Sequence, residues 1–359
     1  MIAKKPLEAV AMKYRRSRNA VIKPLFINFP ITYKCNMRCS MCDIWQRYRK
    51  DPKKLSEELT TEEIERIFSD NSDFLSNVRN VGLTGGEPFL RDDIGDIVRI
   101  IRDNIPNVRL GAQTNGFRTD SIIRNLKDIL RFCPDFGLAV SLDGVMETHD
   151  RIRGVKGTFN NALETIREAR KLGVKRITTG MTLSSINYDQ INKIRDIASE
   201  LDTEFSCFLA DEGDYFDNVG DDSGKLTEDM KQRIISDLKQ FSHNYYMDNL
   251  RRQMEGAKRK LPCYSGFTSF VIDPYGEFRP CLILSDSFGN LKNNKMEDLL
   301  KTEKAVQIRE KVKKCSCWNQ CEVSTSALVD VFDVMRWFMK TDKKREFLSD
   351  VKKKEFVMK

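Results

Sequence analysis

The segment from residue 25 to residue 210 alternates between short apolar runs and amphipathic stretches, which limits the folds open to the chain. Stretches with apolar residues at helical spacing, such as Ile94, Ile97 and Ile101, separate the runs. Strands that alternate with helices form a parallel sheet with right-handed crossovers. We therefore predict an α/β fold, a partial (β/α)6 TIM-like barrel. Its six expected strands are 25–31, 81–84, 108–113, 136–142, 176–183 and 205–209.

Polar residues at the expected helix starts refine these boundaries. Thr60 with Glu63 three residues later forms a capping box, in which each side chain accepts a backbone N–H. A single later helix is expected from Met296 to about Lys313. The four predicted helix caps are Thr60, Asp120, Asn187 and Thr227.

Three cysteines near the N-terminus, Cys35, Cys39 and Cys42, have the spacing C-x3-C-x2-C. Three thiolates can hold a [4Fe–4S] cluster while leaving one iron without a protein ligand, and such an iron can bind a reactant. Structural zinc usually takes four ligands, and no fourth candidate lies near the trio. Disulfides are disfavoured because the sequence shows no signal peptide. We therefore predict an iron–sulfur site, with zinc as the weaker alternative.

Further motifs follow the second, third and fourth expected strands, in the segments 85–88, 114–116 and 141–144, and Arg153 comes next. Together with the cysteine spacing, they resemble the motifs of the radical S-adenosylmethionine (SAM) superfamily over residues 25–325. The resemblance implies that Cys35, Cys39 and Cys42 hold a catalytic [4Fe–4S] cluster whose open iron binds SAM. The SAM-binding residues that it implies are Gly85, Gly86, Glu87, Pro88, Thr114, Asn115, Ser141, Asp143 and Arg153.

Five more cysteines gather late in the chain, around a turn at 273–276 that predicts a hairpin. This layout resembles the twitch and SPASM extensions of radical SAM enzymes, which implies one auxiliary [4Fe–4S] cluster in a small C-terminal α+β domain. The sequence leaves open whether Cys315 or Cys317 ligates it, whether it keeps an open iron, and, more weakly, whether the site is a zinc ribbon. Cys133 and Cys207 are expected to be buried thiols. The predicted auxiliary metal ligands are Cys263, Cys281, Cys315, Cys317 and Cys321.

The resemblance implies a radical SAM enzyme that cleaves SAM reductively and uses the 5′-deoxyadenosyl radical to take a hydrogen atom from its substrate. The auxiliary cluster would transfer electrons or bind the substrate. We expect a small molecule, such as a sugar, a nucleotide or a lipid-linked compound, because only residues 1–24 precede the first strand. A peptide-modifying radical SAM enzyme is the alternative. A non-enzymatic iron–sulfur electron-transfer or scaffold protein is the alternative of another class, which the predicted SAM pocket disfavours.

The acidic loop 211–217 leaves the sixth strand at the barrel mouth, where it would contact the substrate or serve as a solvated linker. The net charge of +8 is concentrated at the chain ends. These basic ends would be solvated, the interpretation we favour, or would contact an anionic membrane surface or an acidic partner. We expect a cytoplasmic enzyme reduced by a low-potential donor such as flavodoxin or ferredoxin, with no nucleic-acid partner.

The expected organisation has five parts. They are a basic arm (1–24), the radical SAM barrel (25–225), a connecting helix (226–255), the auxiliary cluster domain (256–325) and a basic amphipathic tail (326–359).

Overall fold

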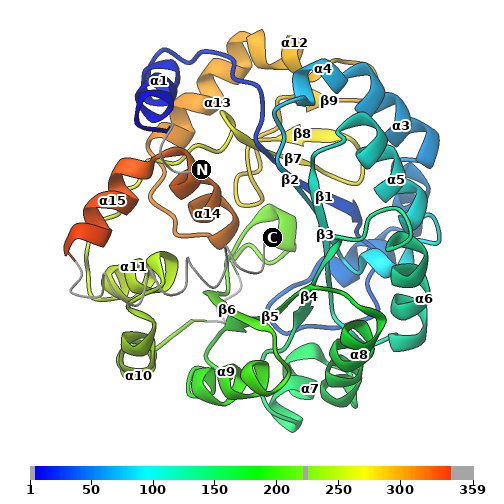
Figure 1. Ribbon diagram of the computed structural model, residues 1–359, viewed down its shortest axis with the longest axis vertical. Coiled ribbons are helices and arrows are strands. Elements are labelled where there is room, and N and C mark those ends of the chain that lie inside the picture. Colours follow the sequence, from blue (N-terminus) through cyan, green and yellow to red (C-terminus); the bar gives the residue numbers. More distant parts are fainter. Residues whose placement is uncertain (1–4, 221–224, 341–359) are drawn as a thin grey trace.

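The computed structural model describes residues 5–220 and 225–340 of the chain. Parts of the predicted basic arm and tail, residues 1–4 and 341–359, lie outside these residues, as do residues 221–224. A curved parallel sheet forms the centre of the molecule, and helices cover its outer side (Figure 1). Its first six strands are β1 (Phe26–Thr32), β2 (Asn80–Gly85), β3 (Arg109–Thr114), β4 (Gly137–Ser141), β5 (Arg176–Leu183) and β6 (Glu204–Leu209).

Each of these strands pairs in parallel with the next one along the chain, which confirms the predicted β–α alternation. The crossovers bury an apolar stripe against the sheet; Ile94, Ile97, Val98 and Ile101 of one helix are fully buried. This burial is the main stabilising contribution of such helices. The helices of this part are α2 (Arg47–Lys50), α3 (Thr61–Asp70), α4 (Ser72–Leu75), α5 (Ile94–Asn104), α6 (Thr119–Ile129), α7 (Glu147–Arg153), α8 (Thr158–Leu172) and α9 (Ile191–Glu200).

Two of the four predicted helix caps are correct and two are wrong. Thr60 and Glu63 form the expected capping box, and the Thr227 side chain accepts a hydrogen bond from Met230 N. Asp120 lies inside the first turn of α6. Asn187 precedes α9 by a full turn, and its amide donates instead to Asp143 O and Thr182 O, linking the ends of β4 and β5.

The predicted C-terminal hairpin is present, and it extends the barrel sheet. Its first strand, β7 (Ser269–Ile272), pairs in parallel with β1, and β8 (Glu277–Arg279) and β9 (Gly289–Asn290) follow antiparallel. The sheet therefore has nine strands in the order β6-β5-β4-β3-β2-β1-β7-β8-β9. The C-terminal α+β region is joined to the barrel by backbone hydrogen bonds along β1.

The C-terminal helices pack around this extension. The single helix expected from Met296 to Lys313 is two helices, because Thr302 is extended and its hydroxyl caps the second one by accepting from Ala305 N. No helix among the described residues is long and apolar enough to cross a membrane. The helices are α10 (Glu228–Leu238), α11 (Tyr245–Met254), α12 (Met296–Lys301), α13 (Glu303–Lys313), α14 (Gln320–Val329) and α15 (Val331–Lys340).

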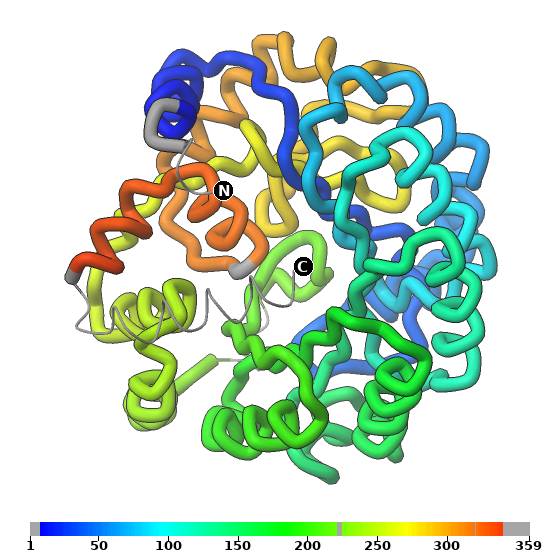
Figure 2. The backbone as a smooth tube through the Cα atoms, viewed as in Figure 1, coloured from blue at the N-terminus to red at the C-terminus, as the bar shows by residue number. Residues whose placement is uncertain are grey.

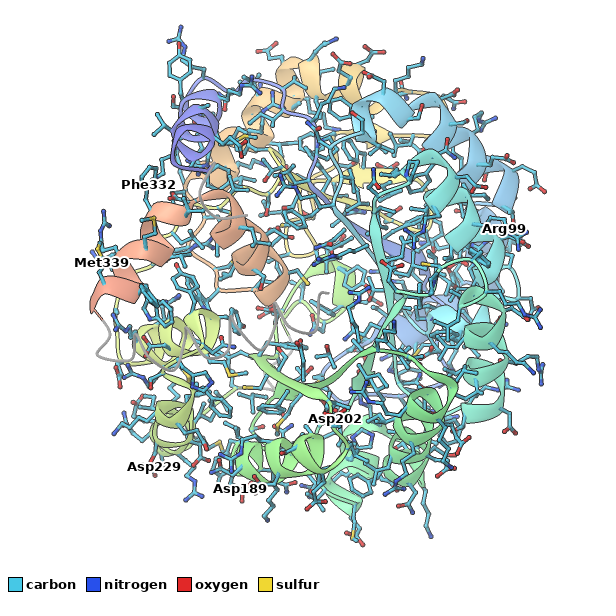
Figure 3. All side chains as sticks on the ribbon, in the orientation of Figure 1. Arg99, Asp189, Asp202, Asp229, Phe332 and Met339 are labelled. Carbon is cyan, nitrogen blue, oxygen red and sulfur yellow. The ribbon has the colours of Figure 1, made fainter. Side chains whose placement is uncertain are left out.

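Part of the N-terminal basic arm forms a helix, α1 (Lys5–Ser17), that lies against the C-terminal helices (Figure 2). Lys13 pairs with the buried Asp330 at 2.9 Å and lies 5.1 Å from the ring of Phe332, which Figure 3 labels on α15. Arg16 Nε donates to Cys263 O at 2.7 Å. At least two basic side chains of the arm thus face protein groups, and nothing in their contacts supports membrane binding.

Candidate active site

The first three cysteines lie together at the carboxyl ends of the barrel strands, on one wall of a cavity. The loop that carries them follows β1, and Cys35, Cys39 and Cys42 all line this cavity. The cavity contains about 1150 Å³ of empty space, part of it at the open mouth. This is the end of a βα barrel where active sites occur.

Backbone contacts with the end of α7 hold the cysteine loop in place. Arg38 N donates to Arg153 O, and Ser40 N donates to Ile152 O, both at 2.9 Å. Gly154 ends α7 with φ of 66°, and a Cβ on it would lie 2.3 Å from Arg38 O. The close approach of loop and helix therefore requires glycine at this position.

The three cysteines are partly buried. Burial raises the pKa of both Cys35 and Cys42 to about 12, and it also raises the pKa of Cys39. A metal must therefore displace their protons before it binds. Arg153 Nη1 lies 3.8 Å from Cys39 Sγ, so a cation stands ready to stabilise the thiolate form.

This donor set fits the [4Fe–4S] group that the sequence predicts. Three convergent thiols on a cavity wall can ligate three irons of a cube and leave the fourth iron facing the cavity. Within residues 5–220 and 225–340, no three His, Cys, Asp or Glu side chains are arranged around a single ion position.

The end of β2 brings bare backbone to the cavity. Gly85 and Gly86 both line it, and a Cβ on either glycine would lie within 2.3 Å of a backbone oxygen at or just after the end of β1. Gly86 N and Glu87 N donate to Thr32 O and Lys34 O, which ties the two strand ends together. The pair therefore fixes the spacing between the cysteine loop and the neighbouring wall.

The predicted SAM-binding residues divide into two groups by position. Glu87, Pro88 and Asp143 are absent from the residues lining the cavity. Glu87 instead lies behind the wall, where its carboxylate accepts hydrogen bonds from Thr114 Oγ1 at 2.9 Å and from Asn115 N at 2.7 Å. The predicted residues that do line the cavity are Gly85, Gly86, Thr114, Asn115, Ser141 and Arg153.

Asp143 serves to position Arg153. Its buried carboxylate pairs with Arg153 Nη2 at 2.6 Å and accepts from Thr182 N at 2.8 Å. Burial lowers the pKa of Arg153, but the attractions of Asp143, Cys39 and Cys35 together outweigh burial and the net shift is upward, so the guanidinium stays charged beside Cys39. His149, behind this pair, accepts from Asp143 N, and burial lowers the pKa of His149 to about 3, so it is neutral.

A further part of the wall comes from the β6 end, the acidic loop and the C-terminal region, and it is mostly apolar. Phe208, Leu209, Phe216 and Leu282 line it. Asp211, the first residue of the acidic loop, is the one acidic side chain among the described residues lining the cavity, and Arg153 is the one basic side chain. Arg153, which is paired with Asp143, is therefore the one cationic side chain of this lining within the described residues.

Asp211 connects the barrel to the C-terminal region. Asn319 Nδ2 donates to Asp211 Oδ2 at 2.6 Å, and Asn319 Oδ1 accepts from Cys321 N at 3.1 Å. Burial raises the pKa of Asp211. The sequence predicts this loop at the barrel mouth, and Asp211 lines the cavity there. The sequence does not predict a role for Asn319, whose only distinguishing feature is its position two residues before the last cysteine.

The late cysteines lie in the C-terminal region, and the last of them, Cys321, lies in the first turn of α14. Cys315 Sγ lies 3.4 Å from Cys317 Sγ, and Cys263 is close enough to Cys315 for a hydrogen bond that raises the pKa of Cys263. Burial raises the pKa of Cys281. Cys321 lines the same cavity as the first trio, so an auxiliary cluster bound to it would border the reaction space.

Cys133 and Cys207 are fully buried, as expected, and neither lines the cavity. Several residues that line the cavity were not predicted from the sequence, although they share one feature, a position at the end of a strand. These residues are Thr84, Gln113, Thr182, Phe208 and Leu209.

Two known protein families match the two segments of the chain that form this site. The profile of the radical SAM superfamily matches residues 29–198, and that of an iron–sulfur cluster-binding domain, SPASM, matches residues 263–322. Together they cover the cysteine trio, the SAM-pocket motifs and all five late cysteines.

Characterised relatives include both peptide-maturation and small-molecule proteins. The chain is 22% identical to the sporulation killing factor maturation protein SkfB of Bacillus subtilis (strain 168), covering 84% of this chain and 70% of SkfB. It is 27% identical to the antilisterial bacteriocin subtilosin biosynthesis protein AlbA of the same strain, with 77% and 59% covered. It is also 25% identical to GTP 3′,8-cyclase of Helicobacter pylori (strain ATCC 700392 / 26695), with 70% and 73% covered. The chain thus spans less than two thirds of AlbA.

Solved structures share the fold. Streptococcus suis SuiB bound to its precursor peptide SuiA superposes with a TM-score of 0.63 at 15% identity, covering 87% of this chain and 72% of SuiB.

Proposed function

Because the chain belongs to the radical SAM superfamily and carries a SPASM-type iron–sulfur domain, we propose that it is a peptide-modifying enzyme. Its substrate would present a neutral or apolar side chain to the cavity between the barrel and the C-terminal region. Hydrogen abstraction from this side chain would begin the modification.

The observation that carries this proposal is the character of the cavity wall. Part of the cavity wall is built from Phe208, Leu209, Phe216 and Leu282, which suits an apolar side chain. The phosphates of a nucleotide or lipid-linked sugar need Arg or Lys partners. The one basic side chain among the described lining residues, Arg153, is already paired with Asp143.

The relatives support the same direction. SkfB and AlbA are maturation or biosynthesis proteins of peptide products, and SuiB has been solved with a precursor peptide bound. This support favours the peptide alternative over the small-molecule substrate that we expected from the sequence. The sequence expectation depended on where the chain begins, which carries no information about leader recognition.

Each group of residues in the site would have a separate role. Cys35, Cys39 and Cys42 would hold the catalytic cluster, and the backbone of Gly85 and Gly86 would lie along SAM. With both groups bound, the site gains one-electron cleavage of SAM and hydrogen-atom abstraction. The protein would orient the substrate side chain and exclude water from it, which prevents side reactions.

The late cysteines would hold an auxiliary cluster on the substrate side. Cys321 lines the cavity, and Cys263 lies with Cys315 and Cys317 deeper in the domain. An oxidised auxiliary cluster so placed could accept the electron that a modified peptide radical must lose. The alternative of a non-enzymatic carrier has no use for a cavity of this size.

The test uses anaerobically reconstituted protein with SAM, dithionite and a panel of candidate substrates. Peptides of equal length would vary one central residue among Leu, Phe, Thr and Lys, and GTP and a UDP-sugar would represent anionic small molecules. We expect apolar peptides to raise 5′-deoxyadenosine formation above the substrate-free rate, with a mass change in the peptide.

A matched pair of variants sharpens this test. Leu282→Arg adds a cation to the cavity wall, whereas Leu328→Arg adds the same charge on an exposed position of α14. L282R should weaken the response to apolar peptides, and L328R should leave it unchanged. Stimulation of the wild-type protein by GTP or the UDP-sugar, with none by any peptide, would refute the peptide proposal.

A further inference from the structure

A groove on the outer surface shares a wall with the reaction cavity. Cys35, Met37 and Trp45 line both spaces. The groove contains about 670 Å³ of empty space, including open solvent, and Tyr48 also lines it. Cys35 also borders a second, wider surface depression beside α6. The catalytic cysteines thus come nearest to the surface at Cys35.

The groove and its surroundings are strongly basic. Lys34, Arg38 and Arg49 line it, all three are exposed, and no acidic side chain among the described residues lines it. Arg49 stacks on Trp45 with its guanidinium carbon 5.2 Å from the ring centroid. Residues 33–54 include seven Lys or Arg residues against Asp43 and Asp51, a local net charge of +5.

We propose that this groove is the docking site of an acidic one-electron donor protein, such as a reduced flavodoxin. The inference rests on the proposed function, because it needs a cluster at Cys35 that must be reduced. Electron tunnelling falls steeply with distance, so a donor protein must dock where the acceptor lies closest to the surface. One electron leaves the reduced flavin and enters the oxidised cluster, so the donor is oxidised as the cluster is reduced.

The charge pattern matches this partner class. Complementary charge steers weak, transient encounters and raises their association rate by about 10- to 1000-fold at low salt. Redox encounters also use small interfaces, for which a shallow groove with a charged rim is sufficient. The aromatic side chains Trp45 and Tyr48 provide the apolar centre that such an interface needs.

The experiment compares a protein donor with a small neutral one. In K34E/R49E the groove changes sign, while in the control K175E/K304E two exposed lysines elsewhere change sign with the same change in net charge. Stopped-flow bleaching of the cluster would be followed with a reduced acidic flavodoxin and with photoreduced 5-deazariboflavin. Calorimetry would measure flavodoxin binding directly.

We expect the groove variant to be reduced at least about tenfold more slowly by flavodoxin at low ionic strength and to bind it more weakly. It should keep the wild-type rate with 5-deazariboflavin, and the control variant should match wild type with both donors. Equal flavodoxin rates in the groove variant and wild type, or equal losses in both variants, would overturn the proposal.

A second measurement needs no variant. Wild-type reduction by flavodoxin should slow with added salt, whereas reduction by 5-deazariboflavin should not, and a salt-independent flavodoxin rate would overturn the docking site. Failure of the proposed function gives a different result, because no candidate peptide would then raise 5′-deoxyadenosine formation or change in mass with either donor. Salt-sensitive binding of an acidic substrate peptide, with flavodoxin unaffected, would assign the groove to the substrate instead.

Discussion

Replacing Gly154 by alanine should have two effects: it should strain the backbone and push the cysteine loop away from α7. Gly154 has φ of 66°, a region where an alanine costs about 1–2 kcal/mol. Its new Cβ would also lie 2.3 Å from Arg38 O, whereas real Cβ contacts essentially never fall below 3.0 Å. The loop must therefore retreat by about 0.7 Å.

That movement is large enough to break the attachment of the loop. The bonds from Arg38 N and Ser40 N to the end of α7 are both 2.9 Å long, and at about 3.6 Å neither would remain a hydrogen bond. Each lost bond costs about 1 kcal/mol, so G154A should cost about 3–4 kcal/mol in all. The displaced Cys39 should no longer complete the catalytic cluster.

Gly173 provides the matched control. Its φ of 96° is also in the left-handed region, but a Cβ there meets nothing within 4 Å. G173A should therefore lower the melting temperature only through the strain of alanine in the left-handed region, and it should bind as much iron as the wild-type protein. In G154A, iron should fall from about eight to about four per chain after reconstitution, with the auxiliary cluster's EPR signal retained. Full iron content in G154A, or equal melting temperatures for the two variants, would refute this reasoning.

Three further predictions follow from buried contacts. Burial raises the pKa of Glu87 to about 7, so the folded protein binds this proton more tightly than the unfolded chain and loses stability as pH rises from about 4.5 to 7. E87Q should therefore make the melting temperature depend less on pH between pH 5 and 8. The same pH dependence in E87Q and wild type would contradict this prediction. C263S and C281S should each lower reconstituted iron from about eight to about four per chain, while C207S, which alters a buried thiol away from the cavity, should not. K13A should lower stability by about 1–2 kcal/mol because Asp330 is left buried without its partner, whereas K304A at an exposed position should be neutral in the same chemical-denaturation assay.

The strand ends of the barrel were predictable because hydrophobic runs and turn glycines mark them locally. The placement of Gly85, Thr114 and Ser141 on one cavity follows from parallel strands ending at the same edge. The prediction that Asn187 caps a helix was wrong. An Asn before an apolar helix resembles a cap, but the Asn187 amide donates to carbonyl groups at two strand ends instead. Local sequence cannot distinguish these two uses.

The contacts between distant segments were the least predictable. Glu87 and Asp143 belong to recognisable motifs, but their side chains act behind the cavity wall as hydrogen-bond acceptors. The basic arm was read as a solvated or membrane-facing end, whereas Lys13 and Arg16 bind groups more than two hundred residues away. Periodicity and spacing carry no information about such partners.

The pairing of β7 with β1 has a consequence for engineering this enzyme. Removing the residues after about 255 would leave β1, an interior strand rich in apolar residues, as an unprotected sheet edge. Such an edge recruits other chains and leads to aggregation. The barrel therefore cannot be shortened to a minimal catalyst simply by deletion, and exchange of C-terminal regions between enzymes would have to preserve the ladder between Phe26–Asn28 and Ser269–Val271.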